Sequence, residues 1–342
     1  MPSYSRNNSV FSTFIGYFAE NADFYTMIQL PPYLERGDTI GITCPASRMD
    51  AQAASYAIEV LCGEGFKVAA GKTVGTAFHN FSAADEVRRK ELQEMLDDPG
   101  IHAILFGRGG YGMIRILDQL DFSAFKKQPK WLCGYSDITA LHLHVHRHLQ
   151  IATLHSVMCS GIVPDTYNGC YVQSLFRTLR GEPARYEFRD HPLNRKGMAR
   201  GELIGGNLSL LANLSGTRSQ PDTRGKILLV EDIGEYRYNI DRMMYNLKRA
   251  GWLDKLNGLL VGAFTDGKET TVPFGQTEYE IIRDKVEEYD FPVAFGFPAG
   301  HQKENYTLKL GVRHEMHCGN TCLLQEEGFL SGKLKAESLK QT

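Results

Sequence analysis

Short apolar runs alternate with segments of helical periodicity through the first half of this chain. The candidate strands are residues 39–44, 66–70, 101–106 and 131–133. Apolar side chains three and four positions apart predict helices over residues 50–62, 82–98 and 113–120, and another after Ser136. Strands and helices in alternation predict a parallel sheet covered on both faces, an α/β domain of Rossmann-like type. In such sheets, ligands bind at the carboxyl ends of the strands.

Beyond residue 180 the pattern changes to shorter strands separated by glycines. The candidate strands here are residues 186–188, 203–204, 227–230, 259–261, 293–295, 307–310 and 322–325. Helices are expected from Asn207 and over residues 239–250, so we predict a second, β-barrel-like α+β domain. The predicted division of the chain is an N-terminal extension (1–31), an α/β domain (32–180), a linker (181–201) and a β-rich domain (202–342).

Composition and charge narrow the class of protein. The 342 residues are 42% hydrophobic and 23% charged, which is typical of a globular protein, and the length suits two domains. A net charge of -2 gives no general attraction to nucleic acid or to acidic lipid, so neither is an expected partner. Seven cysteines without CxxC spacing indicate a reduced, cytoplasmic protein. No apolar stretch reaches the ~18 residues that span a bilayer.

The first 30 residues differ from the rest of the chain. Residues 10–19 are apolar enough to resemble a weak signal peptide, but only Arg6 precedes them and no clear small-x-small cleavage site follows. The regular pattern begins only at Pro32. We therefore expect translation of the native protein to start at Met27, and residues 1–26 not to belong to the fold.

Residues 107–112 (GRGGYG) match the dinucleotide-binding pattern GxGxxG, with Asp137 as a downstream acidic residue. The loop follows the third predicted strand, however, whereas the dinucleotide fingerprint belongs after the first. The same glycines can present backbone N–H donors beside the neighbouring strand end. A dinucleotide-binding oxidoreductase is therefore kept as an alternative, and the preferred interpretation needs no cofactor.

Histidines alternate with other residues along 142–148, and His155 follows. Pairs four positions apart could bind zinc on a helix, but the two pairs face different ways and no HExxH is present. The group HEMH at 314–317 is an equally weak metal signal. We interpret the histidine run as a solvated or half-buried helix face and predict no metal site.

The turn after the fourth strand carries Ser136 just ahead of a helical segment. A strand, a tight turn and a helix would lift this hydroxyl out of the sheet, toward backbone N–H donors that a nucleophile needs for an oxyanion. The backbone N–H groups of Gly110 and Asp137 are the candidate oxyanion hole. A Ser-Asp pair at a helix start is, however, often only an N-cap.

Two distant residues give Ser136 a catalytic interpretation. The apolar run KILLV ends at Glu231, with Glu235 four positions on, and another strand leads through Pro-Ala-Gly to His301. A hydroxyl, an imidazole and a carboxylate are the parts of an activated nucleophile, and all three follow predicted strands. We choose Glu231 as the acid because it directly follows its strand, with Glu235 as the competitor. Taken singly, each residue could be an ordinary polar surface residue.

Six motifs follow one another in a consistent order: GDTIGITCPAS at 37–47, FGRGGYG at 106–112, GYSDIT at 134–139, GELIGGN at 201–207, LLVEDIGEYRYNIDRM at 228–243 and GFPAGH at 296–301. Together they resemble the motifs of the LD-carboxypeptidases, the muramoyltetrapeptide carboxypeptidase family of serine peptidases. The resemblance covers residues 32–330. The turn GYSDI lacks the last glycine of GxSxG, so it departs from the usual hydrolase elbow.

The resemblance implies a triad of Ser136, His301 and Glu231 in a cleft between an α/β domain and a β-barrel-like domain. It implies removal of the terminal D-alanine from a murein tetrapeptide at an L,D bond, and a homodimer. The substrate carboxylate needs a cationic partner, for which Arg108 and Arg242 are the candidates. A microcin-immunity-like hydrolase of peptidyl or aminoacyl adenylate analogues is the alternative on the same scaffold, and an inactive binding module is a third.

Overall fold

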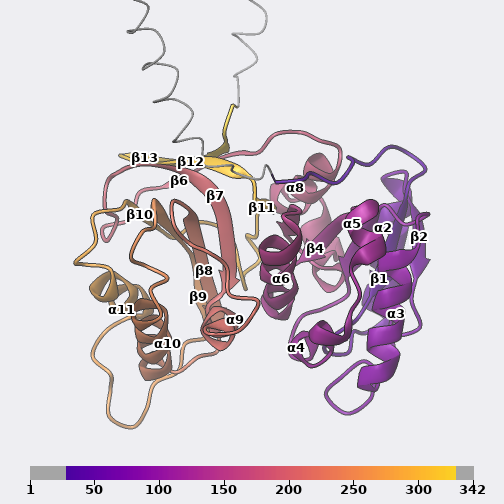
Figure 1. The fold of residues 1–342 in the computed structure, drawn as a ribbon, viewed down its shortest axis with the longest axis horizontal. Helices are drawn as coiled ribbons and strands as arrows, with labels where there is room; N and C mark the ends of the chain where they lie inside the picture. Colours follow the sequence, from indigo (N-terminus) through magenta and orange to yellow (C-terminus); the bar gives the residue numbers. More distant parts are fainter. Residues whose placement is uncertain (1–27, 329–342) are drawn as a thin grey trace, which may run out of the picture.

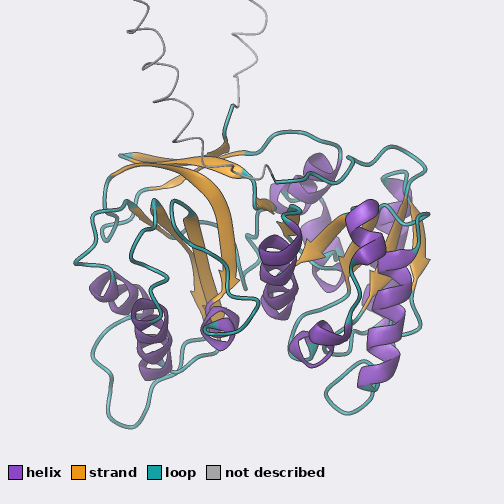
Figure 2. Ribbon diagram, in the orientation of Figure 1, coloured by secondary structure: helices purple, strands orange, loops and turns teal. Residues whose placement is uncertain are grey.

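The structure is a computed structural model and describes residues 28–328. Two sheets lie side by side, each with its own helices (Figures 1 and 2). The resemblance to a signal peptide and the expected start at Met27 lie outside the described residues. Within residues 28–328, no helix combines the length and the apolar character that crossing a membrane requires.

The first sheet has six strands in the order β11-β5-β4-β3-β1-β2. Its strands are β1 (Thr39–Thr43), β2 (Lys67–Ala70), β3 (Ala103–Phe106), β4 (Trp131–Gly134), β5 (Thr153–His155) and β11 (Leu308–Leu310). Strands β1 to β5 pair in parallel, which confirms the predicted parallel sheet. Strand β11, which lies within the predicted second domain, pairs antiparallel with β5 and completes this sheet.

Helices cover both faces of the first sheet. They are α2 (Ala51–Gly63), α3 (Asp85–Asp97), α4 (Met113–Ile116), α5 (Ser123–Lys127), α6 (Thr139–Leu149), α7 (Pro164–Tyr167) and α8 (Cys170–Leu179). Successive side chains of a strand point to opposite faces. In β3, Ile104 and Phe106 belong to a core cluster with residues of α3, α4 and α6, whereas Ala103 and Leu105 belong to a cluster with residues of α2 and α8. Burial on both faces explains why these strands are continuous apolar runs.

The second sheet has seven strands in the order β10-β9-β8-β7-β12-β13-β6. They are β6 (Arg185–Arg189), β7 (Gly197–Asn207), β8 (Ile227–Ile233), β9 (Gly258–Thr265), β10 (Val293–Phe295), β12 (Arg313–Cys318) and β13 (Thr321–Glu326). Strands β7 to β10 are parallel, and the others join β7 as an antiparallel extension. Because β10 and β6 are the two ends of this order, the predicted barrel-like closure is not confirmed.

Helices α9 (Leu208–Leu214), α10 (Arg237–Arg249) and α11 (Glu278–Lys285) accompany the second sheet. Helix α6, which follows the first sheet's β4, packs against β7 and α9 of the second sheet (Figure 1). Leu141 and Val145 of α6 share one buried apolar cluster with Ile204, Leu208 and Leu228. This shared core holds the carboxyl end of β4 close to the polar ends of β7 and β8.

Candidate active site

Ser136 lies two residues beyond the end of β4 and begins a 3-10 turn, Ser136–Ile138, that leads into α6. Its φ of +63° lies in the left-handed region, which residues other than glycine rarely adopt. Such a conformation costs ~1–3 kcal/mol and persists only where the surroundings fix it. The residue is 9% exposed, so it is only just open to solvent.

Ser136, His301 and Glu231 form one chain of hydrogen bonds. Nε2 of His301 lies 2.9 Å from Oγ of Ser136, and Nδ1 of His301 lies 2.7 Å from Oε2 of Glu231. Glu231 is fully buried, within β8 rather than after it. The sequence-based end of this strand was therefore too early, because a register shift beyond Val230 lets β8 continue to Ile233.

The loop after β10 carries His301 to this position. Gly300, just before it, has a φ of +107°, and a Cβ at Gly300 would lie 2.6 Å from Oε2 of Glu231. The loop is tied at both sides, because the N–H of Gly300 donates to Oδ1 of Asn305 and the hydroxyl of Thr265 donates to the carbonyl of His301. Glycine is therefore required where the imidazole approaches the carboxylate.

The electrostatics of the imidazole suit a proton acceptor. Burial lowers the pKa of His301, but the hydrogen bond and the charge of Glu231 outweigh burial, and Asp232 adds to them, so the pKa is raised overall. The ring of Tyr135 packs against His301 with 4.9 Å between ring centroids. Burial, followed by the charge of Glu231, raises the pKa of Tyr135 to about 12, so its hydroxyl stays protonated. Glu231 thus favours the imidazolium that forms when His301 takes a proton.

A pocket of about 390 Å³ opens over the hydroxyl of Ser136. It is lined by Arg108, Gly109, Gly110, Tyr135, Ser136, Met158, Ser160, Asn207, Ser209, Leu210, Asp232, Ile233, Glu235 and His301. The lining residues come from the strand ends of both sheets, as expected for a ligand site in an α/β protein. One arginine and two carboxylates make it a polar pocket, which suits a charged substrate.

The glycine loop 107–112 lies directly against Ser136. A Cβ at Gly109 would lie 2.8 Å from Oγ of Ser136, so only glycine permits this approach. Gly110 lines the pocket, and Asp137 follows Ser136 in the chain. The loop leads into α4, which has only four residues, whereas a dinucleotide loop opens a long helix after the first strand. The position beside Ser136 favours the interpretation of this loop as a source of backbone donors.

Asp232 is a pocket residue that the sequence analysis missed. Its carboxylate accepts hydrogen bonds from Nδ2 of Asn207 (2.8 Å) and from the backbone N–H of Ser209 (2.9 Å). Burial, followed by the charge of Glu231, raises the pKa of Asp232 to about 7. The sequence did contain a signal for Asp232, namely two adjacent acids in the motif VED and Asn207 at the end of the motif GGN. This carboxylate links the ends of β7 and β8 beside the pocket.

The two candidate arginines have different places in the structure. Arg108 lines the pocket, is exposed, and has no ion-pair partner within residues 28–328. Arg242 lies on α10, over the ring of Tyr238, and lines a separate surface depression. The structure therefore does not bring Arg242 to the pocket that holds Ser136. Glu235 does line this pocket, but its carboxylate accepts from Asn239 rather than from His301.

Three histidines of the run, His142, His144 and His146, are buried, contrary to the expected solvated or half-buried face, whereas His148 is exposed. Nε2 of His142 bonds to the carbonyl of Gly134, and Nδ1 of His144 bonds to Oγ of Ser219. His146 contacts Oε2 of Glu202 across the sheet boundary at 3.0 Å. The face is buried because α6 lies between the two sheets. No group of potential metal ligands is found in the part of the chain that the structure describes.

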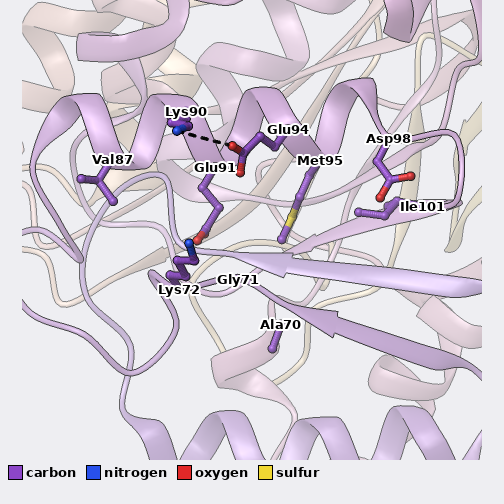
Figure 3. Close-up of a pocket in the computed structure, with 10 residues that line it drawn as sticks. All are labelled: Ala70, Gly71, Lys72, Val87, Lys90, Glu91, Glu94, Met95, Asp98 and Ile101. Atoms are coloured by element: carbon purple, nitrogen blue, oxygen red, sulfur yellow. Dashed lines mark ion pairs between the residues drawn. The ribbon is translucent and has the colours of Figure 1, made fainter.

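A second pocket, of about 360 Å³, lies between α3 and the end of β2, and Figure 3 shows the residues that line it. The buried carboxylate of Glu91 accepts from the hydroxyl of Thr43 and from the backbone N–H of Thr73. Lys90 and Glu94 of α3, which also line this pocket, form an exposed ion pair. No candidate catalytic residue lines this pocket, and its contacts join α3 to the sheet.

Comparisons with known proteins identify the family. Residues 40–156 match the model of the LD-carboxypeptidase N-terminal domain, and residues 200–316 match that of the LD-carboxypeptidase C-terminal domain. The probable murein peptide carboxypeptidase of Bacillus subtilis is 34% identical over 308 residues, which cover 89% of this chain and 97% of that protein. The chain belongs to the LD-carboxypeptidase family.

Solved structures share the LD-carboxypeptidase fold. Muramoyltetrapeptide carboxypeptidase from Oxalobacter formigenes matches with a TM-score of 0.77 and 27% identity, over 86% of this chain and all of that one (100%). The microcin C7 self-immunity protein MccF in complex with aspartyl sulfamoyl adenosine matches with a TM-score of 0.79 and 25% identity, over 88% and 99% of the chains. Membership of the LD-carboxypeptidase family identifies this protein as a hydrolase of the peptidase class.

Proposed function

We propose that this protein is a serine-type LD-carboxypeptidase that releases the terminal D-alanine of murein tetrapeptides. The observation that carries the proposal is the continuous chain of hydrogen bonds from Ser136 through His301 to Glu231, at the floor of a polar pocket. A relative with 34% identity is named a probable murein peptide carboxypeptidase, which supports the substrate class.

The reaction follows from the roles of the three side chains. Nε2 of His301 accepts the proton of Ser136 as Oγ attacks the carbonyl that joins the L-configured centre of the penultimate residue to D-alanine. Glu231 holds the imidazole in the tautomer with its proton on Nδ1 and stabilises the imidazolium. The C–N bond then breaks, D-alanine leaves with the proton from His301, and water releases the peptide from Ser136.

The tetrahedral intermediate carries a negative oxygen that needs fixed donors. The backbone N–H groups of Gly110 and Asp137 are the proposed oxyanion hole, because one lies in the loop against Ser136 and the other follows the nucleophile. Each such donor lowers the barrier by ~3 kcal/mol in comparable enzymes. Their backbone origin means that no side-chain substitution removes them directly.

A carboxypeptidase must recognise the free carboxylate at the end of its substrate. Arg108 is the proposed partner, since it is an exposed cation in the lining and has no ion pair within the described residues. A guanidinium can bind a carboxylate through two parallel hydrogen bonds. Arg242 lines a separate depression and not this pocket, so we do not assign it this role within one subunit.

A microcin-immunity-like hydrolase is the second candidate, because MccF of Escherichia coli is 27% identical over 345 residues, with 89% of this chain and 99% of that protein covered. Nucleobases are commonly bound by stacking on aromatic side chains. In the lining, Tyr135 already packs against His301, and both tryptophans of the chain, Trp131 and Trp252, are buried elsewhere. These features favour the peptide over the adenylate analogue.

The remaining parts of the proposal concern organisation and location. We propose two structural units, residues 32–180 and 202–342, that meet at the pocket. Residues 181–201, which were predicted as a linker, contribute β6 and the start of β7 to the second sheet. A homodimer that recycles wall peptides in the cytoplasm is proposed from the family resemblance. Sedimentation equilibrium of the purified protein tests the homodimer, and a monomer at micromolar concentration would contradict it.

The function is tested by release of free D-alanine from L-Ala-D-Glu-diaminopimelate-D-Ala. Wild-type protein is expected to release it, whereas Ser136→Ala, with an unchanged circular dichroism spectrum, is expected to be inactive. An aminoacyl sulfamoyl adenosine in a parallel assay separates the two candidates. Hydrolysis of that compound without release of D-alanine would replace the peptidase by the second candidate, and equal release by Ser136→Ala would remove the assignment of the nucleophile.

A further inference from the structure

The carboxylate of Asp137 takes no part in the proton transfers above, yet it is 1% exposed and directly follows Ser136. Burial of a carboxylate is costly unless donors or a cation face it. Its Oδ2 accepts a hydrogen bond from the backbone N–H of Met113, at 2.6 Å. The side chain therefore points away from the substrate pocket, toward the loop that enters α4.

A buried arginine contacts the peptide group between Gly112 and Met113, to which this N–H belongs. Nη1 of Arg88, from α3, donates to the carbonyl of Gly112 at 3.2 Å and also to the carbonyl of Pro45. The carbonyl of Gly112 and the N–H of Met113 belong to one planar peptide group. This group is therefore fixed on one side by Arg88 and on the other by Asp137.

This peptide group ends the glycine loop that faces the nucleophile. Gly109 of the loop packs on the side chain of Ser136, and Gly110 lines the pocket. The hydrogen bond between Asp137 and Met113 therefore joins two backbone segments, the loop that contains Gly110 and the turn that contains Ser136. Since each segment supplies one proposed oxyanion donor, the spacing of the two donors depends on this hydrogen bond.

We propose that Asp137 is a positioning residue that sets the geometry of the oxyanion hole by anchoring the loop 107–112 to the nucleophile turn. The inference rests on the proposed function, because the two donors matter only if Ser136 attacks a carbonyl. The proposed role of Asp137 affects how well the tetrahedral intermediate is stabilised, because this stabilisation depends on the positions of the N–H groups relative to the oxyanion. Binding of the unreacted substrate depends on it much less.

The charges around Asp137 agree with an acceptor role. Burial raises the pKa of Asp137 to about 6, while the N–H groups of Met113 and Gly112 and the charge of Arg88 act in the opposite direction. At neutral pH the carboxylate is therefore mainly ionised and can only accept hydrogen bonds. Asparagine at this position can keep an acceptor oxygen on the N–H of Met113, but it removes the negative charge and places an N–H₂ group where Oδ1 has no hydrogen-bond partner among the described residues.

The test compares Asp137→Ala and Asp137→Asn with Thr277→Ala as a matched control. Thr277 accepts from the backbone N–H of Glu280 and caps α11, so its loss also removes a side-chain acceptor from a backbone donor, outside the pocket. Three quantities are measured: kcat and KM for D-alanine release, the affinity for a tripeptide boronate that forms a tetrahedral adduct with Ser136, and the rate of fluorophosphonate labelling of Ser136.

Asp137→Ala is expected to lose about 100-fold in kcat, in boronate affinity and in labelling rate, and Asp137→Asn, which keeps an acceptor without the charge, about tenfold, with KM changed by less than about threefold in both. Thr277→Ala is expected to lower the melting temperature while kcat and labelling stay within about twofold of wild type. If Asp137→Ala does not fold, Asp137→Asn carries the test.

The proposal would be overturned if the folded Asp137 variants were labelled as fast as Thr277→Ala and had a similar kcat. It would also be overturned if KM rose by the same factor by which the boronate affinity fell. Wild-type protein that is labelled but releases no D-alanine would contradict the proposed substrate, and the labelling rates would still decide the role of Asp137. Wild-type protein that is not labelled would overturn both.

Discussion

Nε2 of His301 lies 2.9 Å from Oγ of Ser136, although the two residues are 165 positions apart in the chain. Ser136 is held at the end of the first sheet, and His301 follows β10 at the edge of the second. The bond therefore exists only when the two sheets pack together through their shared core. Substitutions that loosen this packing are expected to affect catalysis before they unfold either sheet.

The identity of the acid is tested by Glu231→Gln with Glu235→Gln as the matched control. Glu231 bonds to Nδ1 of His301 at 2.7 Å, whereas Glu235 bonds to Asn239. Glutamine at 231 is expected to lower kcat about 10⁴-fold, since a neutral amide does not stabilise the imidazolium and its N–H₂ group can hold the imidazole in the wrong tautomer. Glutamine at 235 is expected to stay within about tenfold of wild type in kcat. The reverse order in D-alanine release would reassign the acid to Glu235.

The pH dependence reports the protonation of His301. Neutral imidazole is the form that accepts the proton of Ser136, so kcat/KM should rise with pH. The midpoint should lie above ~6.5, the ordinary histidine pKa, because Glu231 raises the pKa of His301 against the effect of burial. In Glu231→Gln burial is left unopposed by that carboxylate, and the midpoint should move to lower pH. A midpoint that stays in place or rises would show that another group limits the rate.

Gly300 is expected to be intolerant of a side chain. Gly300→Ala combines a left-handed φ with a Cβ 2.6 Å from Oε2 of Glu231, whereas Gly275→Ala has a similar φ of +91° and open space around it. The first should lower the free energy of unfolding by ~2–4 kcal/mol and the second by ~1–2 kcal/mol. Only Gly300→Ala should also reduce kcat, because it displaces the carboxylate. Equal loss of activity in both variants would mean that backbone strain alone matters.

Arg108 and Arg242 provide a test of carboxylate recognition. Arg108 lines the pocket, and Arg242 lies over Tyr238 on α10. Arg108→Ala is expected to raise KM by ~10–100-fold, since a charge-assisted bond to a carboxylate contributes ~1.5–3 kcal/mol. Arg242→Ala should leave KM unchanged. A substrate whose terminal carboxylate is amidated should bind wild type and Arg108→Ala equally, and a retained difference would argue against the contact.

The sequence predicted the elements whose signal is local. Continuous apolar runs marked β1, β3 and β8, because a strand buried on both faces has to be apolar throughout. The positions of Ser136, Glu231 and His301 after predicted strands were enough to suggest a triad, although their meeting depends on packing that no local pattern encodes. The resemblance of six ordered motifs supplied what the pattern left open.

Elements stabilised by distant partners escaped prediction. Strand β5 has three residues, and β12 alternates polar with apolar side chains, so both depend on neighbours that follow from the tertiary fold. The histidines of α6 were expected to be more exposed because their partners, such as Ser219 and Glu202, lie more than 50 residues away. Asp232 was missed for the same reason, since its role depends on Asn207 of the adjacent strand.

The most direct test of the central claim is intact-protein and peptide mass spectrometry after rapid acid quench of the enzyme with the tetrapeptide. The account predicts a transient mass increase equal to the acyl tripeptide, located on the peptide that contains Ser136 and lost in Ser136→Ala. D-alanine released without any such adduct, or an adduct on another residue, would contradict the proposed serine mechanism.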